Sequence, residues 1–325
     1  MIAGRSVREE VVVGEPPRAG PPRTALGPYV LSDVVHRGRS GEVVRAHDTA
    51  HDRVVALKLL APDTAEREFR ARFDRACGTV RTLREPHVLP VLDHGEAGGR
   101  LYVATPLLAG PDLGAVLARE EVLAPERAVA VVEQVARALA AAHARGLAHR
   151  NVKPANVLFT DASAAEVRVG DFGLVSRNGL SLDHTAPERF RGGATDHRED
   201  VYALGCVLFT CLTGARPYPG RSLPERMRGH LDGPIPRPSE QRPGVPPAFD
   251  DVIAGALAKT PAERTATVGT LAAAARAALT EEAREISSAT EHPAGPGTSQ
   301  ARAVRHGGGP RAEGGSDERD DRDVR

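Results

Sequence analysis

The feature of this 325-residue sequence that most constrains its fold is the separation of strand patterns from helix patterns along the chain. Before residue 106, short β-branched runs with Gly-containing turns predict strands. After Gly110, apolar residues recur at the spacing of long helices, and Pro125 marks the start of the clearest one. We predict strands at residues 29–35, 42–47, 53–60, 89–93 and 100–105, an early helix at 64–83, and later helices at 125–144, 199–213, 222–231, 248–258 and 268–279.

A strand-rich part followed by a helix-rich part predicts an α+β fold of two packed lobes with a cleft between them. We place a β-rich N-lobe at about residues 26–107 and a helical C-lobe at about 108–280. The flanking segments, 1–25 and 281–325, are rich in Gly, Pro and charged residues. We expect both to be disordered, because they bury too little apolar surface to offset the entropy of ordering.

The composition excludes several classes of protein. Forty-three Lys and Arg balance 43 Asp and Glu, so nothing in the charge indicates binding to nucleic acid or to a membrane surface. No apolar run is long enough to span a bilayer, and the N-terminus lacks a signal-peptide pattern. Cys77, Cys206 and Cys211 form no closely spaced pair, which favours buried thiols in a reducing compartment over disulfides or a metal site. We therefore expect a cytoplasmic protein.

Five short motifs carry the chemical information. Residues 149–158 read HRNVKPANVL, and the tripeptides DFG at 171–173 and APE at 186–188 follow. Upstream, residues 36–43 read HRGRSGEV and residues 55–58 read VALK. Any one of these motifs could occur by chance. All five in this order, placed on the predicted strands and loops, indicate a common origin.

Together the motifs resemble the protein-kinase family, and most closely its bacterial Ser/Thr kinases. The resemblance covers about residues 29–279. DVYALG at 200–205 is similar to the family's central C-lobe helix, and LAKTPAER at 257–264 to a late stretch whose Arg pairs with the Glu of the APE motif. The resemblance therefore implies a pair between Arg264 and Glu188. It also implies a regulatory stack made of Val80, Val91, His149 and Phe172.

The resemblance implies a site for ATP and Mg²⁺. Gly38 and Gly41 fit two of the three glycines whose backbone N–H groups approach phosphates without a Cβ in the way. Lys58 fits the lysine that holds the α- and β-phosphates, and Lys153 fits the lysine that contacts the γ-phosphate. The implied metal ligands are Asn156 and Asp171.

The same resemblance implies how the base of the nucleotide is held. Val43, Ala56 and Leu158 would sandwich the adenine ring. Residues 105–108 would form the hinge between the lobes, where Leu108 offers backbone groups to adenine. Pro106 lies in this hinge and lacks an N–H, so one potential donor is lost.

Two departures from the family affect the chemistry directly. Asn151 stands where the family has its catalytic Asp, and an amide can orient a hydroxyl but cannot act as a carboxylate base. Ala76 falls at the position of the helix Glu that pairs with Lys58. A two-residue shift of the alignment would offer Asp74 instead, which is too short to reach comfortably.

Two further departures affect the surfaces over the phosphates and the substrate. His36 replaces the first glycine of the hairpin and should stiffen or partly close it. Only twelve residues separate Gly173 from Ala186, which is short for an activation segment. Ser181 falls near the family's Thr position in that segment and His184 near its Tyr position. A short segment offers little surface for a substrate peptide.

Three functions remain open on the sequence. The losses affect catalysis more than nucleotide binding, so the first is a regulatory pseudokinase that binds ATP and Mg²⁺. The second is an active, slow Ser/Thr protein kinase. The third is a structural domain that binds no nucleotide. All three predict protein partners or a protein substrate, with no role for nucleic acid or membrane.

Overall fold

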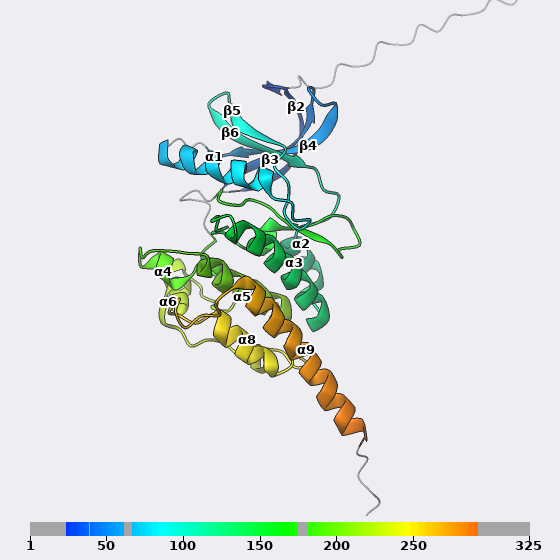
Figure 1. The fold of residues 1–325 in the computed structure, drawn as a ribbon, viewed down its shortest axis with the longest axis vertical. Helices are drawn as coiled ribbons and strands as arrows, with labels where there is room; N and C mark the ends of the chain where they lie inside the picture. Colours follow the sequence, from blue (N-terminus) through cyan, green and yellow to red (C-terminus); the bar gives the residue numbers. More distant parts are fainter. Residues whose placement is uncertain (1–23, 39, 62–66, 175–180, 292–325) are drawn as a thin grey trace, which may run out of the picture. The chain divides into compact units, whose positions relative to one another are not determined.

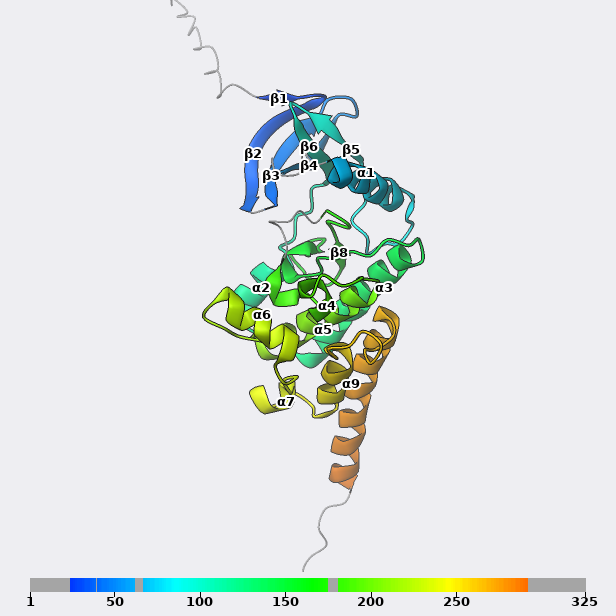
Figure 2. The ribbon, with the colours of Figure 1, turned by 90° about the vertical axis from the view of Figure 1, so that its left-hand side faces the viewer.

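The computed structural model of the chain describes residues 24–38, 40–61, 67–174 and 181–291. The described residues as far as Glu285 pack as one compact unit, and a second unit begins at Ile286. Within the compact unit, a twisted sheet with helix α1 beside it leads into a larger group of helices (Figures 1 and 2). The predicted α+β fold with a sheet-rich N-lobe and a helical C-lobe is therefore confirmed.

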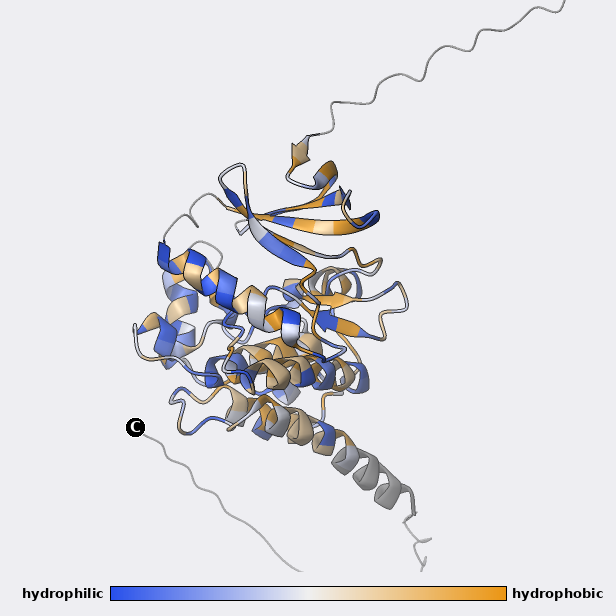
Figure 3. Cartoon of the chain, turned by 45° about the horizontal axis from the view of Figure 1, so that its top comes forward, coloured by the Kyte–Doolittle hydropathy of each residue, from blue (hydrophilic) through white to orange (hydrophobic). Residues whose placement is uncertain are grey.

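The N-lobe is built on an antiparallel sheet of six strands in the order β1-β2-β3-β4-β6-β5. Side chains alternate between its two faces, so in β4 Val55, Leu57 and Leu59 are buried in the lobe while Ala56 and Lys58 face the other way. Hydrophobic residues are prominent along these strands (Figure 3). The strands are β1 (Ala25–Leu26), β2 (Tyr29–Gly38), β3 (Gly41–Asp48), β4 (Arg53–Leu60), β5 (Asp93–Ala97) and β6 (Arg100–Pro106).

One predicted strand was wrong. Residues 89–93 lie mostly before β5, which runs Asp93–Ala97. The reason is the tight turn at Gly98 and Gly99, where both residues have positive φ and Ala97 pairs with Arg100. A two-residue glycine turn of this kind requires strands directly on either side of it.

Helix α1 (Arg67–Thr82) is amphipathic and packs on the N-lobe through one face. Its buried residues recur at helical spacing: Phe69, Phe73, Ala76, Cys77 and Val80. The predicted start at residue 64 lies outside the described residues, and the end agrees with the prediction to within one residue.

The C-lobe core surrounds α5 (Arg198–Thr213), which is buried on nearly every side, and α3 (Pro125–His143) packs against it. Gly214 ends α5 in the left-handed conformation that glycine adopts without strain. The short helices α2, α4 and α7 were not predicted. The remaining elements are α2 (Leu113–Glu120), β7 (Val157–Phe159), β8 (Val167–Val169), α4 (Pro187–Phe190), α6 (Leu223–Asp232), α7 (Pro238–Gln241), α8 (Ala248–Ala256) and α9 (Val268–Glu291).

The last helix is longer than predicted. We expected it to end at residue 279 and a disordered tail to start at 281, but α9 continues to Glu291. Residues 280–286 read TEEAREI, which contains good helix formers and no Gly or Pro to end the helix. The remainder of the predicted tail, and the leader up to residue 23, lie outside the described residues.

A buried ion pair anchors the loop after α8, as the resemblance implied. The guanidinium of Arg264 donates to both carboxylate oxygens of Glu188, at 2.8 and 2.9 Å. It also donates to the carbonyl of Arg198 at the start of α5. This bidentate pair connects three segments of the C-lobe that are distant in sequence.

The three cysteines are free and buried. Cys77 lies on α1, and Cys206 and Cys211 lie on α5. In the described part of the chain, no helix meets the length and hydropathy expected of a transmembrane segment.

Candidate active site

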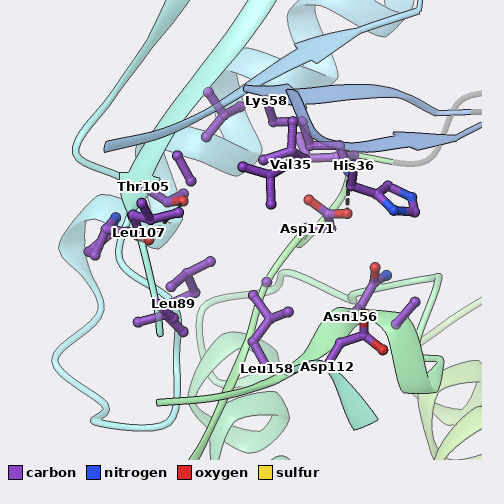
Figure 4. Close-up of a pocket in the computed structure, with 18 of the residues that line it drawn as sticks. Val35, His36, Lys58, Leu89, Thr105, Leu107, Asp112, Asn156, Leu158 and Asp171 are labelled. Atoms are coloured by element: carbon purple, nitrogen blue, oxygen red, sulfur yellow. Dashed lines mark hydrogen bonds and ion pairs between the residues drawn. The ribbon is translucent and has the colours of Figure 1, made fainter. Parts of the chain in front are cut away.

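A cavity of about 390 Å³ lies where the two lobes meet. In Figure 4, Lys58 reaches it from the sheet above, and Asn156, Leu158 and Asp171 reach it from the C-lobe below. Eight of the residues predicted from the sequence line this cavity: Val43, Ala56, Lys58, Leu108, Lys153, Asn156, Leu158 and Asp171. The fold thus brings together residues that are more than one hundred positions apart.

One end of the cavity is apolar. Val43 on β3 and Ala56 on β4 form its upper wall, and Leu158 on β7 forms its floor. Ala56 faces the cavity because the alternating residues Val55 and Leu57 are buried in the N-lobe core. A flat, apolar ligand group fits between these walls.

The segment between the lobes closes this end. Ala56 on β4 pairs with Thr105, and Pro106 is the last residue of β6. Leu107 and Leu108 follow without regular structure and line the cavity. The N–H of Leu108 makes no hydrogen bond to any residue that the structure describes, so it remains available to a ligand.

The other end of the cavity is polar. Lys58 Nζ contacts Asp171 Oδ2 across the cleft, with side chains 15% and 25% exposed. Burial, the largest single effect, raises the pKa of Asp171, but the charge and hydrogen bond of Lys58 together with the charges of His149 and Lys153 outweigh it, so the net pKa is below its ordinary value. Asp171 has φ +66°, a strained conformation that costs about 1–3 kcal/mol and aims its carboxylate into the cleft.

Asn156 and Lys153 complete the polar end. Asn156 Nδ2 donates to the carbonyl of Asn151 at 2.8 Å, which fixes the amide and leaves its oxygen as the free acceptor. Lys153 is partly buried, and this burial lowers its pKa. An amide oxygen beside a carboxylate suits a hard cation such as Mg²⁺. No group of three or more His, Cys, Asp or Glu side chains in the described ranges could hold a metal.

The loop that carries Asn151 is fixed from below by Asp200. Its carboxylate accepts hydrogen bonds from the backbone N–H groups of His149 and Arg150, both at 2.7 Å. The ring of His149 donates to the carbonyl of Gly170 at 2.8 Å and lies 4.6 Å from the ring of Phe172. Phe172 and Val80 belong to one hydrophobic cluster, and Val91 packs against that cluster. Within the implied stack, His149 and Phe172 are therefore in contact.

Comparison with known proteins agrees with this geometry. Residues 29–275 match the family described as the protein kinase domain. The chain belongs to the protein kinase family. The sequence is 47% identical over 268 residues to the serine/threonine-protein kinase PknE of Mycobacterium tuberculosis, a match that covers 79% of this chain and 47% of PknE. It is 46% identical to PknD of the same organism, covering 78% of this chain and 40% of PknD.

Solved structures show the same relation. The kinase domain of Mycobacterium tuberculosis PknI superposes with a TM-score of 0.69 at 33% identity. The match covers 80% of this chain and 99% of the PknI domain. The chain thus has the fold of a bacterial Ser/Thr kinase domain, and it spans less than half the length of the curated relatives it matches.

In this member of the family, Asn151 stands at the position of the catalytic Asp, and its side chain has a structural role. Asn151 is not among the residues that line the cavity. Its Oδ1 accepts a hydrogen bond from the backbone N–H of Ser181 at 3.3 Å. Thr185 in turn donates to the carbonyl of Ser181, and Ser181 Oγ lies 3.0 Å from Nδ1 of the half-buried His184. Asn151 therefore holds the end of the activation segment.

The structure also shows the consequence of having Ala76 at the position of the family's helix Glu. Ala76 is buried, and a Cβ placed on Gly173 would lie 2.8 Å from the Ala76 Cβ. Asp74, the alternative partner for Lys58, is exposed on α1, so the shifted alignment was wrong. Among the described residues, Asp171 is the only acidic side chain within ion-pair distance of Lys58.

The glycine hairpin is present, but its glycines form the turn and do not line the cavity. Gly38 and Gly41 pair at the tip of β2 and β3 and do not line the cavity, whereas Ser40 and His36 do. Gly41 has φ +126°, and a Cβ there would lie 2.0 Å from the Leu59 carbonyl oxygen. No other residue could form this turn without moving β4.

Sequence reasoning missed part of the cavity lining. Asp112 lies beside the hinge and caps α2, its Oδ1 accepting from Ala115 N at 2.9 Å, so its sequence signal was that of a helix start. Cys77 reaches the cavity from α1, where it matched the pattern of a core residue. Residues 175–180 of the activation segment lie outside the described residues.

Proposed function

We propose that this kinase-family protein binds ATP with Mg²⁺ in the cleft and acts as a regulatory pseudokinase with strongly impaired phosphoryl transfer. The observation that carries this proposal is at Asn151. The position of the catalytic base holds an amide, and its oxygen is occupied by the backbone N–H of Ser181. Meanwhile Lys58, Lys153 and Asp171 remain around the cavity.

The cavity fits a nucleotide in size and chemistry. A volume of about 390 Å³ lies within the range of small-molecule sites. Its apolar end suits the base, and Leu108 offers a free backbone donor. Lys58 and Lys153 at the polar end suit phosphates, while Asp171 and the Asn156 oxygen suit Mg²⁺. When bound, the metal would supply neutralisation of phosphate charge.

Two losses lower the expected rate. Removing a general base typically costs about 10²–10⁴-fold, and Asn151 has no carboxylate. Ala76 supplies no carboxylate to hold Lys58, which instead contacts Asp171. Binding of Mg²⁺ and phosphates has to separate this pair before either side chain reaches its ligand.

An active, slow Ser/Thr kinase is the second candidate. The assembled contact between His149 and Phe172 favours it, as does the retention of Lys58 opposite Asp171. The relatives at 46–47% identity are named as serine/threonine-protein kinases. For this candidate, the hydroxyl of a protein Ser or Thr would accept the γ-phosphate with Asn151 acting only to orient it.

The experiment measures binding and transfer on the same preparation. Titration calorimetry with Mg-ATP gives Kd for the wild type, Lys58→Met and Asp171→Ala, and radiolabelled ATP with a Ser/Thr peptide library gives the transfer rate. We expect wild-type binding that both variants weaken, and wild-type transfer no faster than in Lys58→Met. Asn151→Asp should raise transfer above that background, because it restores the base.

The possible outcomes separate the candidates. Wild-type transfer well above Lys58→Met would establish the slow kinase and reject the pseudokinase. A wild type that binds no nucleotide would reject both and leave a structural domain. Asn151→Gln serves as the matched control for Asn151→Asp, since it changes the side chain without adding a carboxylate.

We also propose that the partners are proteins, in the cytoplasm. The equal numbers of acidic and basic residues support a partner other than nucleic acid, and three buried free thiols support a reducing compartment. Cross-linking in cells followed by mass spectrometry tests both points. Recovery of nucleic acid as the principal cross-linked species would reject the first.

A further inference from the structure

His36 replaces a glycine in the hairpin and faces the cavity. Its strand, β2, shifts register between Val34 and His36, which then pairs with Val43. The next residue, Arg37, is 74% exposed and pairs with Glu42 at 3.4 Å. His36 itself lines the polar part of the cavity, and Figure 4 shows its ring on the same side as Asp171, above Asn156.

His36 is exposed, and its ring lies beside Gly38 on the hairpin. A Cβ placed on Gly38 would lie 3.0 Å from His36 Nε2, closer than an ordinary contact. The absence of a Cβ at Gly38 therefore leaves room for the imidazole. The missing Cβ of Gly38 thus lets the imidazole lie close to the hairpin backbone, on a residue that borders the cavity.

At the polar end of the cavity, Lys58 is not fully available as a hydrogen-bond donor to phosphate. Lys58 is engaged with Asp171, and no helix carboxylate stands at Ala76 to draw it away. An imidazole N–H on a side chain that lines the cavity is a donor suited to phosphate oxygens. Such a donor would compensate for a lysine whose charge is partly neutralised within the protein.

We propose that His36 is a phosphate-contacting residue, whose ring donates a hydrogen bond to the polyphosphate of the bound nucleotide. This inference rests on the proposed nucleotide binding. A side chain at a glycine position was expected to stiffen or partly close the hairpin. The inference is instead that His36 helps to bind the phosphates. His36 would recognise a nucleoside di- or triphosphate. The affinity for adenosine, which has no phosphate, would not depend on His36.

The test is a set of dissociation constants for ATP, ADP and adenosine by calorimetry. In His36→Ala we expect ATP and ADP to bind about tenfold more weakly, as for loss of one hydrogen bond to a charged group, with adenosine unchanged. Gly38→Ala should act in the same direction because its Cβ displaces the ring. His47→Ala, on the neighbouring strand β3, is the matched control and should bind as the wild type does.

Each alternative outcome has a distinct meaning. Equal or tighter ATP binding by His36→Ala, with wild-type binding intact, overturns this inference and shows that the ring obstructs the site. Equal weakening of adenosine and ATP also overturns it, since the effect then has no relation to phosphate. A wild type that binds neither ATP nor adenosine overturns the proposed function and this inference together.

Discussion

Arg264 has a fully buried guanidinium, and its charge is met by Glu188, whose side chain is 10% exposed. The ring of Tyr202 lies 5.1 Å from the guanidinium carbon. Removing one partner from such a pair leaves the other charge buried and uncompensated, which is far more costly than losing an exposed pair. The surface pair between Arg276 and Glu133 is the natural comparison, with side chains 51% and 30% exposed.

For this residue we predict that Arg264→Ala lowers the free energy of unfolding by about 3–5 kcal/mol. Arg276→Ala should lower it by less than about 1 kcal/mol, because water and salt screen the exposed pair. Urea denaturation monitored by circular dichroism measures both. Equal losses for the two variants would contradict the buried ion pair.

Among elements, α1 and the segment after β8 approach each other unusually closely. Ala76 on the helix and Gly173 after Phe172 leave no room for a second Cβ between them. Gly173 also has φ +67°, which L side chains rarely adopt. The small residue at the helix-Glu position thus lets α1 rest directly on this segment.

We predict that Gly173→Ala destabilises the protein by about 2–4 kcal/mol, from backbone strain plus overpacking. Gly192→Ala is the matched control, because Gly192 has φ +68° and nothing within 4 Å of its built Cβ. That control should lose only about 1 kcal/mol, the strain alone. Thermal denaturation of the two variants side by side measures the difference, and equal losses would show that α1 yields without cost.

The elements that could be predicted from sequence were the long, periodic ones. The pattern for α3 began at Pro125, and the observed helix ends within one residue of the prediction. The short helices α2, α4 and α7 have too few turns to show a period. The strand predicted at 89–93 was misplaced because the apolar Leu89, Val91 and Leu92 favoured a strand there, whereas the Gly98-Gly99 turn sets the position of β5.

The residues of the site also fall into those that could be predicted from the sequence and those that could not. Residues inside contiguous motifs, such as Lys58 and Asp171, could be predicted because chemistry restricts them in type and order. Asp112 and Cys77 reach the cavity only through the folding of their helices around it. That the Asn151 side chain binds the Ser181 backbone also depends on the tertiary fold, since thirty residues separate them.

For the whole molecule, two histidines with lowered pKa, the buried His230 and the half-buried His184, couple stability to pH. Burial lowers the pKa of His184 and of His230 to about 4, below the ordinary value near 6.5 that each recovers on unfolding. Between these values the unfolded chain binds more protons than the folded one. Their contribution to stability is therefore complete above about pH 6.5 and is lost progressively as the pH falls toward 4.

We predict that the free energy of unfolding falls between about pH 6.5 and pH 5, by at most about 1.4 kcal/mol per pH unit for each histidine. His230→Gln removes one titrating group and keeps an acceptor for the Tyr202 hydroxyl, which lies 2.9 Å from His230 Nδ1. Its stability should vary less with pH than that of the wild type in urea titrations. An identical pH slope would mean that His230 is not responsible.

The extent of the folded unit gives another whole-molecule prediction. Every buried hydrophobic residue of the described chain lies between Tyr29 and Ala278. Residues 292–325 are rich in Gly and charged residues, so we predict that their deletion leaves the melting temperature unchanged within about 2 °C, since a loss of 1 kcal/mol shifts Tm by roughly that amount or more. Differential scanning calorimetry of the full and shortened chains is the measurement. A clear drop would show that the deleted residues pack on the rest.

The burial of all three thiols has a practical consequence for spectroscopy. Burial raises the pKa of Cys77 and of Cys211 to about 12 and raises that of Cys206 as well, so little thiolate forms at neutral pH to attack an alkylating reagent. A cysteine introduced on the surface of each lobe could then carry a maleimide fluorophore in an otherwise wild-type protein. Energy transfer between two such dyes would follow opening and closing of the cleft in solution.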